Sequence, residues 1–146
     1  MSLMFAYGMN TNLMSMAQRC PAAVPMGHAI IENYRFRFAV HADIVPEHGA
    51  YVDGVLWEVT DTCVESLDQT EGYPFYYDKR IVTANHNGKD MDTLVYVMVP
   101  NHPDSEPGKT YYQMCTEGYL ENGIPTAQLT EALDNKFKPR YNIDIL

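Results

Sequence analysis

Glu71 stands at a position where a carboxyl group could act as an acid or a base. It lies four residues after Leu67 and seven after Val64, so a continuous helix would place it on their apolar face. Burial on that face disfavours the ionised form, and the negative end of the helix dipole opposes it as well. Both effects raise the pKa of the carboxyl group toward neutrality, which suits general acid/base catalysis. The alternative is a helix that has frayed by Glu71, with the side chain in water.

The segment Tyr7-Gly8-Met9-Asn10 is a second candidate, and it suits the binding of a negatively charged group. A short apolar run ends at Gly8, and Asn12 is a capping residue before Leu13, so we expect a strand that turns sharply into a helix. Gly8 allows a ligand to approach the backbone. Free N–H groups at the start of a helix can hold a carboxylate or an oxyanion. An ordinary strand-to-helix turn remains the alternative on these residues alone.

Other kinds of site are not indicated by the sequence. The five histidines show no HExxH or comparable spacing, so no metal site is predicted. No serine lies in a GxSxG motif, and the chain has neither a GxGxxG motif nor a GxxxxGK phosphate loop. We interpret Asp68, three residues before Glu71, as a solvated helix position rather than a partner of that carboxyl group.

Strands and helices alternate irregularly along residues 1–146, which favours one mixed α+β domain over a doubly wound parallel sheet. The segment Tyr34-Arg35-Phe36-Arg37-Phe38 alternates aromatic and cationic residues, as a strand with one buried face does. Strands are predicted over residues 3–7, 27–40, 51–59, 75–83 and 92–99. Helices are predicted from Asn12 to the residue before Pro21, and over residues 61–71, 110–120 and 126–133. No element is predicted after Pro139.

Several residues mark where these elements begin and end. Thr62 with Glu65 matches a capping box at the start of the helix that carries Glu71. Gly72, directly after that carboxyl residue, ends the same helix. Asn87-Gly88 predicts a tight hairpin, and Gly54 inside a strand suggests a bulge.

The composition limits the classes of partner. The chain has a formal net charge of −9 and scattered basic residues, so neither nucleic acid nor an anionic membrane is expected as a partner. No apolar run approaches the roughly 20 residues that span a bilayer, and no signal peptide is apparent, so we expect a cytoplasmic protein. The three cysteines are odd in number and far apart, which fits a reducing compartment better than a disulfide framework. Residues 1–3 are either native or an addition ahead of Met4.

Four ordered motifs resemble the γ-glutamylcyclotransferase-like superfamily, which includes AIG2-like and BtrG-like proteins. Tyr7-Gly8-Met9-Asn10 resembles its YGSN loop. Residues 67–77 are similar to its L-D-x-x-E-G-x-P segment, and Gly54-Val55-Leu56-Trp57 is similar to the G-x-L/V-W/Y strand that precedes it. The stretch from Tyr111-Tyr112 through Gly118 to Gly123-Ile124-Pro125 resembles its C-terminal Y…G…G-L-P pattern. These motifs run in family order over nearly the whole chain.

The resemblance implies a small, mixed β-barrel-like sheet with flanking helices. It also implies release of 5-oxoproline from a small-molecule γ-glutamyl amine or amide, without a cofactor. By this resemblance Glu71 is the acid/base residue. The loop from Tyr7 to Asn10 binds the glutamyl α-carboxylate and the γ-carbonyl oxygen, and one of Tyr111 and Tyr112 lies in the pocket wall.

Met9 departs from the family pattern, which usually has a small hydroxyl residue at this position. If only the backbone N–H group matters, Met9 keeps the function; if the hydroxyl binds substrate or fixes the loop, activity or specificity changes. Met9 therefore favours one alternative, a non-catalytic binder of a glutamyl-like or carboxylate ligand on the same scaffold. Another alternative is an enzyme that acts on a γ-glutamyl group carried by a larger molecule.

Overall fold

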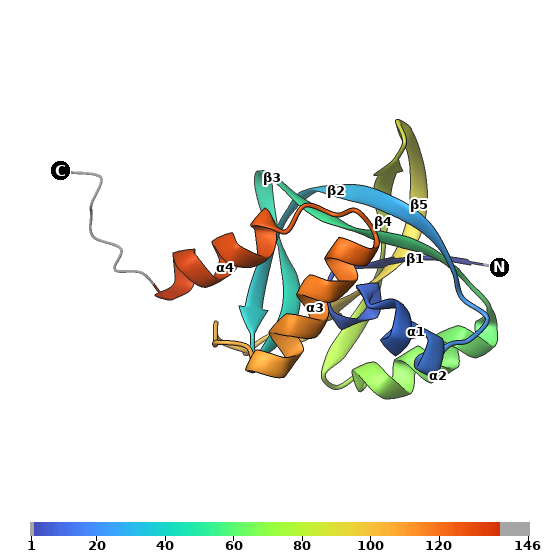
Figure 1. Ribbon diagram of the computed structural model, residues 1–146, viewed down its shortest axis with the longest axis horizontal. Coiled ribbons are helices and arrows are strands. Elements are labelled where there is room, and N and C mark those ends of the chain that lie inside the picture. The colour runs from blue at the N-terminus through green and yellow to red at the C-terminus, as the bar shows by residue number, and fades with distance from the viewer. Residues whose placement is uncertain (1, 138–146) are drawn as a thin grey trace.

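Five strands close into a small barrel in the computed structural model, which describes residues 2–137. Around the barrel the strands follow the order β1-β3-β2-β4-β5. The first and last strands of this order meet in parallel at Met4 and Leu94, whereas the other pairs are antiparallel, so the sheet is mixed. The predicted α+β barrel with flanking helices is confirmed (Figure 1). The strands are β1 (Ser2–Ala6), β2 (Val24–Ala39), β3 (His41–Val59), β4 (Tyr77–His86) and β5 (Lys89–Met98).

Helices α1, α2 and α3 gather on one side of the barrel, whereas α4 extends away toward the C-terminal end (Figure 1). Within residues 2–137, no helix is both long and apolar enough to cross a membrane. The segment after Pro139, for which the sequence predicts no element, lies outside the described residues. The helices are the 3-10 helix η1 (Met9–Thr11), α1 (Leu13–Arg19), α2 (Asp61–Glu71), α3 (Lys109–Glu121) and α4 (Ala127–Phe137).

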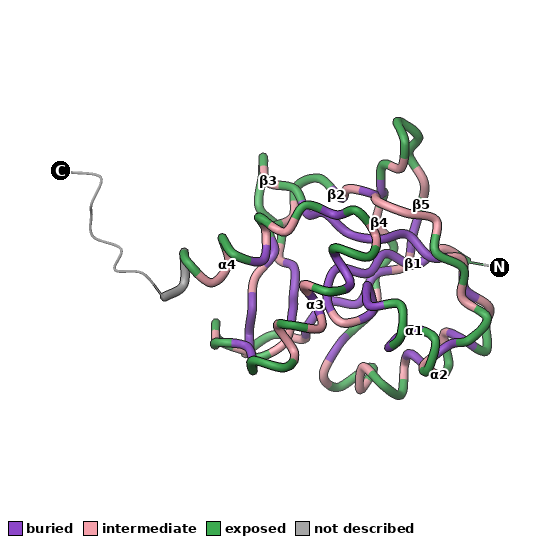
Figure 2. The backbone as a smooth tube through the Cα atoms, viewed as in Figure 1, coloured by how far each residue is buried: buried purple, intermediate pink, exposed green. Residues whose placement is uncertain are grey.

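Alternation along the strands fills the barrel interior, and Figure 2 shows the buried residues following them. On β2, Phe36 and Phe38 are buried and pack edge to face, with ring centroids 5.0 Å apart. Of the two arginines in this stretch of β2, Arg35 is exposed, and Arg37 is half-buried in an ion pair with Asp43. The one-faced strand predicted from this alternation is confirmed. The largest fully buried side chains include Tyr119, Phe5, Met4, Met16, Ile31, Leu56, Leu67 and Leu129.

Strand β3 is longer than the sequence predicts. The prediction of a strand over residues 51–59 alone is wrong, because β3 begins at His41 and pairs with β2 from the Ala39–His41 turn onward. Proline and glycine usually interrupt a strand, yet Pro46 and Gly49 both lie within β3. There β2 shifts register between Glu32 and Tyr34, and this irregularity accommodates the two residues in the paired strand.

The predicted bulge at Gly54 is also wrong. Gly54 pairs with Ala29 in regular register. A Cβ atom at this glycine would lie 2.4 Å from the carbonyl oxygen of Ala6 and 2.4 Å from the ring of Phe5. The glycine is therefore needed for the close approach of β1, not for an irregular backbone.

Helix α2 begins with a different cap from the one predicted. Thr60 is the N-cap, and its hydroxyl accepts a hydrogen bond from the N–H group of Cys63 at 3.1 Å, so the predicted box of Thr62 and Glu65 does not cap the helix. The predicted C-terminal end is confirmed, because Gly72 adopts the left-handed conformation with φ 69°. The Asn87-Gly88 hairpin between β4 and β5 is confirmed as well, with φ 54° and 81°.

Cys20 at the end of α1 and Cys63 on α2 are joined in a disulfide, with their Cα atoms 5.1 Å apart. The interpretation of the cysteines as unpaired thiols is therefore wrong for this pair. They lie 43 residues apart in the sequence, so only the packing of α1 on α2 brings them together. Cys115 is free and buried, and burial raises the pKa of its thiol to about 12.

Helix α3 packs closely on the segment that joins η1 to α1. A Cβ atom at Gly118 would lie 2.2 Å from Thr11 Oγ1 and 2.6 Å from the backbone nitrogen of Asn12. Real Cβ atoms essentially never approach so closely, and one of the contacts is with backbone. Gly118 thus allows the helix and the segment to touch.

We expect Gly118→Ala to lower the free energy of unfolding by about 1–3 kcal/mol through overpacking. This loss should exceed the gain in helix propensity from glycine to alanine, which is roughly 1 kcal/mol. Gly108→Ala is the matched control, because Gly108 has an ordinary φ of −65° and a Cβ atom there would meet open space. Denaturant unfolding measures both variants. A Gly118→Ala protein as stable as the control variant would mean that the segment yields without strain.

Candidate active site

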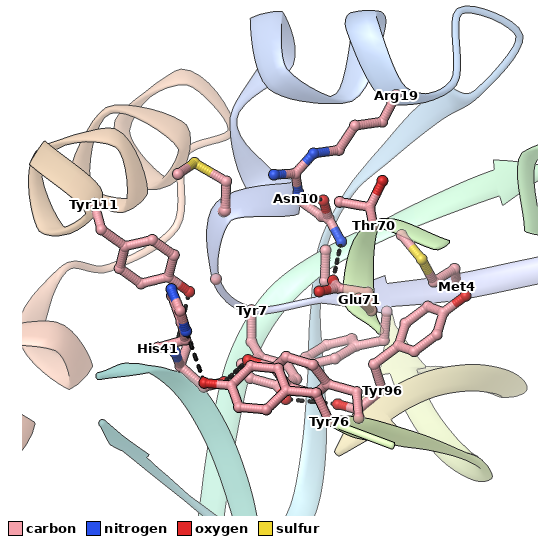
Figure 3. Close-up of a pocket in the computed structure, with 16 residues that line it drawn as sticks. Met4, Tyr7, Asn10, Arg19, His41, Thr70, Glu71, Tyr76, Tyr96 and Tyr111 are labelled. Atoms are coloured by element: carbon pink, nitrogen blue, oxygen red, sulfur yellow. Dashed lines mark hydrogen bonds between the residues drawn. The ribbon is translucent and has the colours of Figure 1, made fainter. Parts of the chain in front are cut away.

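A cavity of about 200 Å³ opens between the barrel and the helices, and Glu71 lies in it (Figure 3). It brings together most of the site residues predicted from the sequence, although they come from the turn after β1, from η1, from α2 and from α3. Tyr112 is not among the lining residues; its ring packs against Phe38, with centroids 5.9 Å apart. The predicted residues that line the cavity are Tyr7, Gly8, Met9, Asn10, Glu71 and Tyr111.

Helix α2 continues through Glu71, whose side chain is partly buried rather than free in water. The side-chain amide of Asn10 donates a hydrogen bond from Nδ2 to Glu71 Oε1 at 2.8 Å. Burial raises the pKa of Glu71 above its ordinary value, because a desolvated carboxylate loses its hydration. The positive charge of Arg19 and the hydrogen bond from Asn10 act in the opposite direction.

The loop after β1 is held from several sides. Thr11 donates from Oγ1 to the carbonyl oxygen of Gly8 at 2.7 Å, and Asn122, the C-cap of α3, donates to the carbonyl oxygen of Thr11 at 2.8 Å. Asn12 accepts from the N–H group of Ser15 as the N-cap of α1 and donates to the carbonyl oxygen of Met114. The backbone of the loop is therefore fixed by contacts with α1 and α3.

The same loop offers donors to a ligand. Among the residues that the structure describes, none accepts a hydrogen bond from the backbone N–H groups of Gly8, Met9 or Asn10. These groups precede or begin the short helix η1, so they have no acceptor within it. A Cβ atom at Gly8 would lie 3.0 Å from the hydroxyl of Tyr111, so a side chain here would crowd the wall of the cavity.

Tyrosine hydroxyl groups bind backbone atoms around the cavity. Tyr7 donates to the carbonyl oxygen of Tyr96 at 2.5 Å, Tyr77 donates to that of Ala42 at 2.6 Å, and Tyr111 accepts from the N–H group of Ala42 at 3.0 Å. Burial raises the pKa of each of these tyrosines above its ordinary value, so the hydroxyl groups stay protonated at neutral pH. They tie the turn after β1 to β5, β4 to β3, and α3 to β3, without adding charge.

Ten further residues line the cavity that were not predicted as site residues, and four of them are Arg19, His41, Tyr76 and Tyr96. His41 Nδ1 and Tyr76 Oη are 2.7 Å apart, and burial lowers the pKa of this histidine. Each of the four comes from a different element or loop, and only Tyr76 lies in one of the sequence motifs, the segment 67–77. Only strand pairing and the docking of α1 place Arg19, His41 and Tyr96 beside Glu71, so no local pattern in the sequence would have found these three.

Asp68 does not pair with Glu71. It forms an ion pair with Lys79 at 2.9 Å and accepts a hydrogen bond from the hydroxyl of Tyr96 at 2.7 Å. Its side chain is partly exposed, as expected for a helix position near solvent. The carboxyl group available inside the cavity is therefore that of Glu71.

The cavity combines one carboxyl group of raised pKa, backbone N–H donors and neutral aromatic walls. A carboxyl group of raised pKa can accept a proton and return it in general acid/base catalysis. The N–H donors can stabilise negative charge on a substrate carboxylate or on an oxygen that becomes charged during a reaction. The arrangement suits acid/base chemistry on a small molecule that carries a carboxylate.

Comparison with known proteins agrees with this architecture. Residues 4–115, most of the chain, match the family described as "Gamma-glutamyl cyclotransferase, AIG2-like". The mouse protein named "Gamma-glutamylcyclotransferase" is 28% identical over 137 residues, which cover 84% of this chain and 72% of the mouse protein. The bovine protein of the same name is 27% identical over 160 aligned positions, which cover 98% of this chain and 85% of the bovine protein.

Solved structures show the same fold. One titled "Gamma-glutamyl cyclotransferase" superposes with a TM-score of 0.82 at 24% identity and covers 99% of this chain and 95% of its own. At this level of identity the likeness bears on the fold alone. Together with the family match over residues 4–115, it establishes that this chain belongs to the AIG2-like γ-glutamyl cyclotransferase family.

Proposed function

We propose that this protein is a γ-glutamyl cyclotransferase that releases 5-oxoproline from a small γ-glutamyl amine or amide, with Glu71 as general acid and base. The observation that carries the proposal is the partly buried Glu71 carboxyl group, hydrogen-bonded to Asn10 inside the cavity beside the loop N–H donors. Pockets for drug-sized ligands usually measure roughly 300–1,000 Å³. A cavity of about 200 Å³ therefore suits a glutamyl group, with the leaving amine at its mouth.

The nucleophile in this reaction belongs to the substrate. The α-nitrogen forms a bond to the γ-carbon, and the bond between that carbon and the amide nitrogen breaks. Glu71 takes a proton from the α-ammonium group and passes it to the departing nitrogen. The α-nitrogen loses a second proton as it becomes the lactam N–H, and the departing amine takes this proton too and leaves as an ammonium group, so protons balance over the cycle. Holding the folded conformer in which attack occurs can contribute roughly 7–11 kcal/mol to lowering the barrier. Because the substrate supplies the nucleophile, the reaction as proposed needs no cofactor.

The loop from Tyr7 to Asn10 supplies the donors in this proposal. Its N–H groups bind the glutamyl α-carboxylate and the γ-carbonyl oxygen, which gains negative charge as the ring closes. One well-placed donor to such an oxygen contributes about 3–4 kcal/mol. The bonds that hold the loop to α1 and α3 support this role, because donors that are already fixed need not reorganise during the reaction.

A non-catalytic binder on the same scaffold is the second candidate, and Met9 favours it because the family usually has a small hydroxyl residue there. The unused burial of a carboxyl group would destabilise such a protein, which argues for catalysis. Both candidates predict stabilisation by 5-oxoproline in a thermal shift assay. Only an enzyme releases product from a γ-glutamyl amide, so product formation separates the two.

We expect Glu71→Gln to lower turnover at least about a hundredfold, because the variant keeps the shape of the side chain and removes the base. The assay measures 5-oxoproline by mass spectrometry after incubation with γ-glutamyl amino acids, γ-glutamyl-ε-lysine and glutathione. Glu65→Gln is the matched control, since Glu65 lies exposed on the same helix. Near-normal turnover in the Glu71 variant would remove this residue from the mechanism.

The same substitution should affect stability in a pH-dependent way. Burial raises the pKa of Glu71 in the folded protein, so its contribution to stability falls as the pH rises from about 4.3, the ordinary value, through the raised value. Glutamine stays neutral and keeps an oxygen that can accept from Asn10. At pH 7 we expect the free energy of unfolding of Glu71→Gln to equal or exceed that of the wild type. Below about pH 4 this difference should vanish. A variant that is less stable at pH 7 would contradict a net penalty for burying the carboxylate.

The substitution Met9→Ser tests whether the side chain at this position matters. The hydrogen bonds of the loop involve only the backbone of Met9, so we expect the variant to keep the fold and to stay within about tenfold of wild-type turnover. A larger gain in turnover would show that a hydroxyl group at position 9 binds the substrate. The measurement is kcat/KM for the best substrate of the panel.

A further inference from the structure

Arg19 lies at the upper wall of the cavity, beside Asn10 and Glu71 (Figure 3). Its Nη1 donates a hydrogen bond to Asn10 Oδ1, and Asn10 Nδ2 in turn donates to Glu71 Oε1 at 2.8 Å. Among the side chains that the structure describes, Arg19 forms no ion pair with a carboxylate. The three side chains thus form a directed chain of donors that ends on the carboxyl group of Glu71.

The direction of this chain depends on Arg19. An asparagine amide has one end that donates and one that accepts, whereas a guanidinium group can only donate. Arg19 can therefore bond only the oxygen of Asn10, and this contact turns the NH₂ end toward Glu71. Without Arg19 the amide could rotate and place its oxygen against the carboxylate, which would remove the hydrogen bond to Glu71 and repel its charge.

Apart from the titratable Glu71, the only charged side chain among the described residues that line the cavity is that of Arg19, which is permanently positive. The titratable groups that face Glu71 from the surrounding elements are tyrosines, and burial raises the pKa of each, so they stay neutral. His41 also lines the cavity, and burial lowers its pKa, so it is neutral near pH 7. A neighbouring cation favours the ionised form of a carboxyl group. The tyrosines are Tyr7, Tyr76, Tyr77, Tyr96 and Tyr111.

The helix that carries Glu71 also holds Arg19 in place. Ser66 on α2 donates from its hydroxyl to the carbonyl oxygen of Arg19 at 2.6 Å. The next residue, Cys20, is joined to Cys63 on the same helix. Since Cys63 and Ser66 are three residues apart, both lie on the face of α2 that meets the end of α1. One helix therefore sets the position of the cation relative to the carboxyl group.

We propose that Arg19 is a positioning residue for the reaction, which acts through Asn10 to orient the Glu71 carboxylate as the proton acceptor. The proposal rests on the function proposed above for Glu71. It assigns Arg19 no contact with the substrate. It explains why a cation with no ion-paired carboxylate stands beside a carboxyl group of raised pKa: Arg19 limits the rise that burial causes.

The test is the pH dependence of kcat/KM in Arg19→Met and Arg19→Lys. The methionine variant loses the donor and the charge, so the midpoint of the acidic limb should move up by about one pH unit or more. For a shift of one unit its activity should then fall about tenfold at pH values well below both midpoints, and recover at higher pH. Lysine keeps one donor and the charge, so Arg19→Lys should keep a midpoint near that of the wild type. Arg35→Met is the control for loss of a positive charge, because Arg35 pairs with Glu47 on the exposed surface and does not line this cavity.

An equal loss of activity at every pH, with an unchanged midpoint, would overturn the proposal and leave Arg19 a purely structural residue. Unchanged activity in Arg19→Met would overturn it as well. Titration of the Glu71 carboxyl group by ¹³C NMR separates this proposal from the proposed function, because it needs no turnover. A wild-type protein that releases no product would contradict the function. Even then, a pKa of Glu71 that is higher in Arg19→Met than in the wild type would support the chain of donors from Arg19 through Asn10 to Glu71. An unchanged pKa of Glu71 would overturn the proposal.

Discussion

A carboxyl group that leaves water must be neutralised or given donors, and the Glu71 side chain imposes this requirement on the whole cavity. The structure meets it with one amide donor from Asn10 and one guanidinium group behind that amide. It provides no direct ion pair for Glu71 among the described residues, so burial still raises the pKa. The balance leaves a group that can bind and release a proton, which a tight ion pair would prevent.

The tyrosines around the cavity make this balance possible because their hydroxyl groups are hydrogen-bonded and uncharged. The hydroxyl groups of Tyr7 and Tyr77 bind carbonyl oxygens of neighbouring strands, and that of Tyr119 binds the carbonyl oxygen of Tyr7 at 2.5 Å. Gln128 of α4 donates to the same Tyr119 hydroxyl and pairs with the backbone of Asp53. These bonds connect α3 and α4 to the strands behind the site, so the wall of the cavity is rigid as well as neutral.

The sequence predicts the parts of this arrangement that depend on local spacing. Glu71 falls on the last turn of α2 because Val64, Leu67 and Gly72 mark the face and end of that helix, and the structure agrees. Local capping rules were less reliable. Thr60 and Thr62 are both suitable N-cap residues, and the hydrogen bond that the Cys63 N–H group donates to the hydroxyl of Thr60 identifies Thr60 as the cap.

Contacts between distant segments could not be predicted from spacing. Arg19 and His41 are unremarkable in the sequence, and they reach the cavity only because α1 docks on α2 and β3 starts ten residues before the predicted strand. The Cys20–Cys63 disulfide depends on the same docking. Pairing between residues far apart in the chain is a property of the closed barrel, which no local pattern encodes.

The bonds that hold the loop after β1 come from Thr11, Asn12 and Asn122, and none uses the side chain of Met9. Position 9 therefore faces the cavity without contributing to the hydrogen bonds that support its own backbone. A residue of this kind can change during evolution while the donors beside it keep their geometry. Variation here would alter the shape available to the substrate and leave the scaffold intact, so substrate preference and folding can evolve independently at this position.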